Sequence, residues 1–188
     1  MLRKIRLAVT GLFFATLIFY GICYLANQVL FQEKMDEVVI EDCRNEGIRA
    51  SVHLKHLVDY RVLVINYQAV PGAVGPKGVF RSFVQLSNKL EDYEFDRVVL
   101  AFRSVPRVYI DGETFNRMGD RYGKGKMLEL VARFASNLRL MNGDLAFSAL
   151  PHHYSAMLEQ ELHGGITETA PGENGETFTL PGFSPQQD

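Results

Sequence analysis

The stretch GDRYGKGKM, from Gly119 to Met127, contains the glycines and the lysine with which a phosphate-binding loop holds a nucleotide. In such a loop a strand runs directly into G-x-x-x-x-G-K-[ST], backbone amides surround the phosphates, and the final hydroxyl binds Mg²⁺. Here five residues separate Gly119 from Gly125, and the residue after Lys126 is a methionine, which cannot bind Mg²⁺. We therefore expect no nucleotide and no cofactor, and we interpret the stretch as a connection between two helices.

Basic residues are concentrated in the middle of the chain. Between Arg97 and Arg139 the segment carries a net charge of +5, whereas from Asp144 onward there are seven acidic residues and no Lys or Arg. A basic surface could bind an anionic ligand, an acidic partner or lipid headgroups, and the alternative is that these charges are scattered over solvated faces. The candidates for anion or acidic-partner binding are Arg103, Arg107, Arg121, Lys124 and Lys126. Nucleic acid is not an expected partner, because the whole chain has a net charge of −2.

Histidines and glutamates share one stripe of a predicted helix in PHHYSAMLEQELHGG. His152 lies seven residues before Glu159, which is about 10 Å along a helix axis, so one ion cannot bind both. Only Glu159 and His163, four residues apart, could hold a metal together, and a solvated helix face explains the stripe more simply. We expect no metal. No nucleophile elbow, Ser-His-Asp order or C-x-x-C is present, so the sequence identifies no catalytic residue.

An uncharged apolar segment, residues 7–26, precedes all of these motifs. Twenty helical residues rise about 30 Å, the thickness of the bilayer core, so the segment predicts a transmembrane helix that holds the chain in a lipid bilayer. Cleavage as a signal peptide is the alternative, since Arg3, Lys4 and Arg6 form a basic region before it. Tyr24 argues against cleavage, because it occupies the position where a peptidase site requires a small residue.

The flanking charges predict the orientation of this helix. The basic residues before it favour a cytoplasmic N-terminus in the plasma (inner) membrane, with the rest of the chain outside the cytoplasm and periplasmic in a Gram-negative bacterium. The absence of an N-x-Ser/Thr sequon favours a bacterial envelope. Cys23 falls in the membrane segment, so we expect Cys43 to be a half-buried free thiol or, alternatively, to form an intermolecular bridge.

The periodicity of the remaining chain predicts an α/β or α+β domain with a mixed sheet covered by about three helices. Alternating or β-branched runs predict strands near 48–54, 61–67, 97–102, 106–111 and 145–150. Helical spacing predicts helices over 79–93, 127–141 and 151–164, and one helical turn in 112–119. The chain is thus divided into 1–27 (cytoplasmic stub and anchor), 28–47 (stalk or anchor extension), 48–164 (extracytoplasmic domain) and 165–188 (disordered acidic tail).

Two classes of function are compatible with this organisation. The first is a single-pass envelope protein whose outer domain is a binding or assembly module for a protein partner in the membrane or envelope. The second is a membrane-anchored enzyme that acts on an anionic envelope substrate with an arginine-rich pocket and a histidine acid or base. The absence of a convergent set of catalytic residues in the sequence favours the module over the enzyme.

Overall fold

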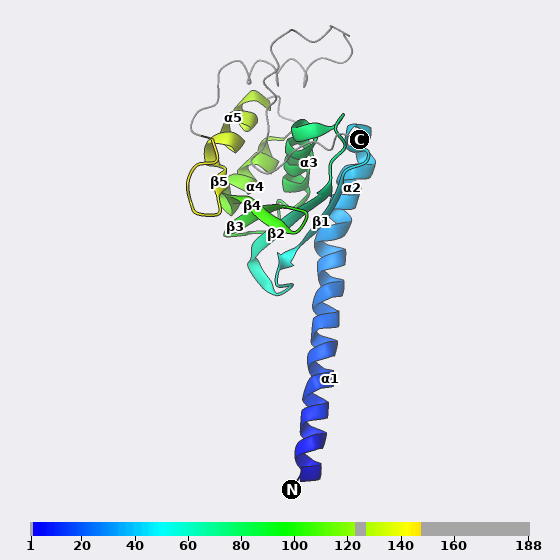
Figure 1. The fold of residues 1–188 in the computed structure, drawn as a ribbon. Coiled ribbons are helices and arrows are strands. Elements are labelled where there is room, and N and C mark those ends of the chain that lie inside the picture. The colour runs from blue at the N-terminus through cyan, green and yellow to red at the C-terminus, as the bar shows by residue number, and fades with distance from the viewer. Residues whose placement is uncertain (1, 123–126, 148–188) are drawn as a thin grey trace.

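The computed structural model describes residues 2–122 and 127–147, and Figure 1 shows how their helices and strands are arranged. The chain begins with α1 (Leu2–Asn27), continues through a π-helical turn η1 (Gln28–Gln32), and ends this first part with α2 (Glu33–Glu41). Asn27, Gln32 and Glu33 all have right-handed helical dihedrals, so the three elements form one unbroken helix. By length and composition this helix could cross a membrane.

Five strands form one mixed sheet in the order β1-β2-β3-β4-β5. The strands are β1 (Arg49–Lys55), β2 (Asp59–Ala69), β3 (Arg97–Phe102), β4 (Val105–Asp111) and β5 (Arg139–Leu140). Only β2 and β3 are parallel, and they are joined by a crossover through a helix, as parallel neighbours must be. The prediction of a mixed sheet combined with helices is confirmed, and the fold is α+β.

The helices that follow the first long helix lie on one side of the sheet, as Figure 1 shows. They are α3 (Gly75–Lys89), α4 (Gly112–Arg121) and α5 (Met127–Asn137). Alternate residues of the central strands, such as Leu63, Ile65 and Leu100, point toward these helices and are fully buried. Phe83 of α3 meets Phe115 of α4 edge to face, with ring centroids 5.1 Å apart, at the centre of this core.

Residues 28–47, for which the sequence predicted a stalk or an anchor extension, continue the first helix as far as Glu41. The predicted helical extension is present, but Phe31, Met35 and Val38 are buried in the hydrophobic core of the domain. Their spacing of four and three residues places them on one face of a helix. A short 3₁₀ helix, η2 (Cys43–Asn45), then turns the chain into β1. The domain therefore includes this part of the first helix, and no separate stalk divides the two.

Several element boundaries also differ from the prediction. Helix α3 has the predicted length but begins at Gly75, four residues earlier than predicted, and α4 extends over ten residues where one helical turn was predicted. Helix α5 ends at Asn137, and Met141, which continues its stripe in the sequence, is exposed in the following turn. Of the strand predicted at 145–150, Leu145 makes a single bridge to Arg139 and residues 148–150 lie outside the described residues. The predicted helix over 151–164 and the predicted tail over 165–188 lie outside them as well.

Candidate functional site

Two of the basic residues proposed from the sequence share the β3–β4 hairpin, and a third lies at the end of α4. Arg103 is in the tight β3–β4 turn, where its guanidinium lies 5.2 Å from the centre of the Phe102 ring. Arg107 is half-buried on β4, and its Nε atom is buried without a hydrogen-bond partner. Arg121 ends α4 and forms an ion pair with Glu129 of α5. The remaining candidates, Lys124 and Lys126, lie outside the described residues, as do the metal candidates Glu159 and His163.

The histidines that could act as the acid or base of an anchored enzyme, His53 or His56, are not near Arg103. His56 lies in the β1–β2 turn, at the end of the sheet where β2 begins, whereas Arg103 follows β3 at the end where β2 finishes. Asp59 and Tyr67 are eight positions apart along β2, which corresponds to about 26 Å of extended chain. His53 is on β1, two strands away from β3. Within residues 2–122 and 127–147, no three His, Cys, Asp or Glu side chains gather as a metal site.

The glycine that opens the GDRYGKGKM stretch has a packing role. Gly119 is in the last turn of α4, and a Cβ atom there would lie 2.5 Å from the backbone carbon of Ser87 on α3. The missing side chain lets the two helices approach closely, and the Gly119 carbonyl accepts a hydrogen bond from the Asn88 side chain at 3.1 Å. A helix thus precedes residues 123–126, at the place where a phosphate-binding loop would require a strand.

The most distinctive polar arrangement joins the first helix to the edge of the sheet. Asn27 is only 4% exposed, and its side-chain oxygen accepts a hydrogen bond from the backbone N–H of Leu54 at 2.6 Å. Its side-chain nitrogen donates to the carbonyls of Leu57 at 3.0 Å and of Cys23 at 2.8 Å. One amide group thus holds the end of the apolar helix against the end of β1.

Gln32 repeats this arrangement further along β1. Its side-chain oxygen accepts from the backbone N–H of Val52 at 2.9 Å, and its nitrogen donates to the carbonyl of Ala50 at 3.2 Å. Because β1 is an edge strand, these backbone groups have no neighbouring strand to pair with. The side-chain amides of Asn27 and Gln32 therefore take the place of a neighbouring strand. We call these two residues, together with their four hydrogen bonds to the backbone of β1 and of the β1–β2 turn, the helix–sheet joint.

The π-helical turn explains how two residues five positions apart can face the same strand. Around an α-helix such residues point about 140° apart, whereas the i to i+5 hydrogen bonds of a π-helix bring them close together. The Glu33 N–H donates to the Gln28 carbonyl, which is a bond of this kind. The widened turn between Asn27 and Gln32 thus positions both amides for the joint.

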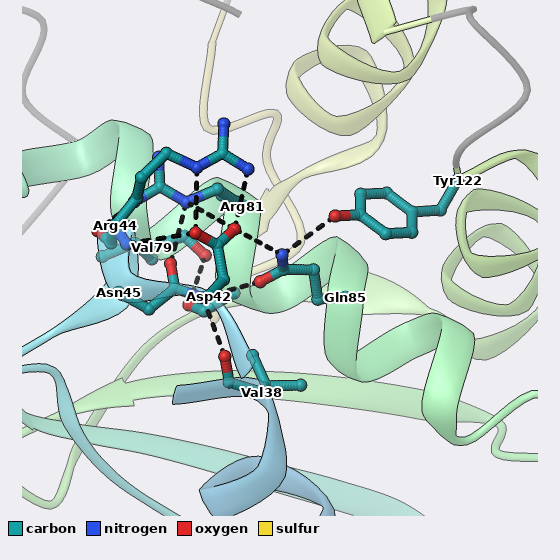
Figure 2. A network of polar contacts seen from close by, with 9 residues as sticks. Val38, Asp42, Arg44, Asn45, Val79, Arg81, Gln85 and Tyr122 are labelled. Carbon is teal, nitrogen blue, oxygen red and sulfur yellow. Dashed lines mark hydrogen bonds and ion pairs between the residues drawn. The ribbon is translucent and has the colours of Figure 1, made fainter. Parts of the chain in front are cut away.

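A second polar network lies at the other end of α2 and connects it to α3 and α4, as Figure 2 shows. The Asp42 carboxylate accepts hydrogen bonds from Arg44 Nε at 2.9 Å and Nη2 at 2.7 Å, and from Gln85 Nε2 at 2.8 Å. The same Gln85 nitrogen donates to the Tyr122 hydroxyl at 2.9 Å. The fully buried Asn45 donates to Gln85 Oε1 at 2.6 Å and accepts from Arg81 Nε at 2.8 Å.

Electrostatics support a structural role for this network. The hydrogen bonds from Arg44 and Gln85 hold the pKa of Asp42 well below its ordinary value of 3.8, so the carboxylate is charged at neutral pH. Burial lowers the pKa of Arg81, and the negative charge of Asp42 offsets part of this lowering. Since the buried donors and acceptors of Asp42, Asn45 and Gln85 are directed at one another, the network fixes α2 against α3.

The joint and the network were not predicted from the sequence. Asn27 and Gln32 are five residues apart, a spacing that matches neither an α-helix nor a strand. A usable signal was present in Phe31, Met35 and Val38, whose spacing is that of an amphipathic helix packed on a core. Cys43 is exposed, in contrast to the half-buried thiol that we expected, and both cysteines are free.

Comparison of the chain with protein-family models, curated proteins and solved structures finds no match.

Proposed function

We propose that this chain is a single-pass protein of the plasma membrane whose extracytoplasmic domain is a binding or assembly module for a protein partner in the membrane or envelope. The observation that supports this proposal is the helix–sheet joint. It attaches the domain to the apolar helix through backbone-directed hydrogen bonds, and the helix itself continues into the domain core.

A fixed attachment suits recognition of a partner in the same membrane. Binding costs translational and rotational freedom, and a domain held at one height and one angle has already lost part of it. Confinement near a partner also raises the effective concentration of the binding surface. A domain that captures small soluble molecules gains little from such restraint, because the ligand diffuses to it in any orientation.

The alternative function, an anchored enzyme that acts on an anionic substrate, has less support. It required arginines and histidines in one pocket, and among the described residues Arg103, Arg121 and His56 belong to three separate regions. We therefore retain the module as the proposed function.

The topology can be tested with the native thiols. Cys43 is exposed on the domain, whereas Cys23 lies in the apolar helix. A membrane-impermeant maleimide should label Cys43 in intact spheroplasts of a bacterial host that produces the full chain, and the Cys43→Ser variant should remain unlabelled. Labelling that requires lysis would place the domain in the cytoplasm, and a mature N-terminus near Asn27 would identify the helix as a signal peptide.

The assembly role needs a test of its own. A photo-crosslinking amino acid at exposed Ile40 or Val105 should give an adduct of discrete mass in cells. The yield should fall when Asn27 and Gln32 are both replaced by alanine, because the loosened joint no longer presents the domain at one angle. No adduct at either position, or an adduct unaffected by loosening the joint, would contradict the proposal.

A further inference from the structure

The exposed apolar side chains of the first helix define where its lipid contact ends. Val29 and Leu30 are 55% and 42% exposed, although they follow Asn27 at the end of α1. From Phe31 to Val39 no large apolar side chain of the helix is exposed, because Phe31, Met35 and Val38 face the core. Continuous apolar exposure therefore ends about 6 Å beyond Ala26, the end of the uncharged segment, and the next exposed large apolar side chain of the helix is Ile40, near the end of α2.

The β1–β2 turn lies at this same level. The Leu57 carbonyl is 3.0 Å from the Asn27 side-chain nitrogen, so the turn is held beside the end of α1. Figure 1 shows the turn as the part of the domain that reaches farthest toward the N-terminal end of α1. The headgroup layer on each side of a bilayer is about 5–7 Å thick. A turn fixed at Asn27 would lie within that layer.

The turn also has the side chains of an interfacial segment. Val58 and Tyr60 are 46% and 72% exposed, and they follow His56 and Leu57, the turn residues whose φ angles are 53° and 66°. Tyrosine favours the membrane interface, where its ring is shielded and its hydroxyl stays hydrated. An exposed valine beside it gains apolar burial on contact with lipid.

The charges around the turn are balanced. Lys55 and Asp59 lie on either side of it, and Arg61 is paired with Asp96 at 3.5 Å. The turn consequently has no strong attraction to anionic lipid, and its contact with a bilayer would depend on the apolar and aromatic side chains.

From these observations we infer that the β1–β2 turn inserts Val58 and Tyr60 into the headgroup layer of the bilayer that holds α1. This inference rests on the proposed membrane anchor. It gives the domain a second lipid contact beside the helix, which fixes the height of the sheet above the membrane. The ligand is the lipid interface in general, so a zwitterionic bilayer suffices.

Tryptophan fluorescence can test this contact, because the chain has no tryptophan. Full-length Tyr60→Trp is reconstituted in phosphatidylcholine vesicles with or without bromine atoms on the acyl chains near the headgroups. Phe19→Trp, in the exposed apolar part of α1, reports insertion of the anchor. Val105→Trp, exposed at the opposite end of the sheet, is the matched control for a surface position away from lipid.

Brominated lipid should quench Phe19→Trp and Tyr60→Trp but leave Val105→Trp unchanged, and the emission of Tyr60→Trp should shift to shorter wavelength on reconstitution. Quenching of Phe19→Trp alone would overturn the inference and leave the anchor intact. Failure to quench Phe19→Trp would overturn the membrane anchor and the inference with it. Quenching of Tyr60→Trp only in anionic vesicles would contradict the apolar mechanism.

Discussion

Replacing Asn27 by alanine should open the helix–sheet joint without unfolding the domain. The substitution removes the oxygen that accepts the Leu54 N–H at 2.6 Å and the nitrogen that donates to the Leu57 carbonyl at 3.0 Å. Because Asn27 is only 4% exposed, water has little access to replace these bonds. A buried donor left without an acceptor costs about 1–3 kcal/mol.

This cost should be visible in hydrogen exchange of one amide. The Asn27 side chain protects the Leu54 amide in the native joint. If the substitution lowers the free energy of opening this amide by about 1–3 kcal/mol, its exchange becomes about 5- to 150-fold faster. The assay is amide exchange of the full-length chain in detergent micelles, followed residue by residue by NMR. The amide of Leu100, in the central part of the sheet, should keep its rate, because the change is local.

Val29→Ala provides the matched control, since Val29 is a near neighbour of Asn27 on the helix but its side chain is exposed. Its Leu54 amide should exchange as in the parent protein. The reasoning is refuted if Leu54 exchanges at the parent rate in Asn27→Ala. Equal acceleration of Leu54 and Leu100 would also refute it, because it would show global destabilisation instead of a local opening.

The core and the polar network lead to three further predictions. Val131→Asp should lower the free energy of unfolding, measured in thermal melts, by several kcal/mol because it buries a carboxylate. The control Ala132→Asp, on the exposed side of α5, should change this free energy by less than about 0.5 kcal/mol. Gly119→Ala should lower the melting temperature, measured by circular dichroism, because its Cβ would lie 2.5 Å from the Ser87 backbone. Asp42 has a lowered pKa in the folded chain, so its stabilising contribution is complete above its ordinary pKa of 3.8 and is lost as the pH falls further. Denaturant titrations should therefore show a smaller loss of stability below pH 4 for Asp42→Asn than for the parent.

The sheet was largely predictable because its strands carry strong local signals. RVLVINY and RVVLAF are nearly continuous β-branched or apolar runs, which are typical of strands in the middle of a sheet, and they became β2 and β3. The short connection between β3 and β4 indicated a hairpin, which the structure contains. Its turn residues, Arg103 and Ser104, have positive φ angles that sequence rules associate with Asn or Gly.

The candidate site was predictable only in part, because it depends on tertiary contacts. An asparagine at the end of an apolar helix has many possible partners, and only the fold places the Leu54 N–H in front of Asn27. The arginines show the converse limit. A net charge along the sequence indicated a basic segment, but the strand and helix directions separated Arg103 from Arg121 and paired the latter with Glu129. Charge density along a chain does not determine charge density on a surface.

If α1 spans a bilayer as proposed, the unbroken first helix couples the orientation of the domain to the tilt of α1 in that bilayer. A transmembrane helix tilts when its apolar length differs from the hydrocarbon thickness. The helix continues from Asn27 to Glu41, which is about 21 Å at 1.5 Å per residue, and the joint prevents the domain from pivoting independently. A tilt of about 20° would displace the upper end of α2 sideways by about 7 Å and turn the sheet through the same angle. Membrane thickness would thereby be converted into the orientation of the surface that the domain presents.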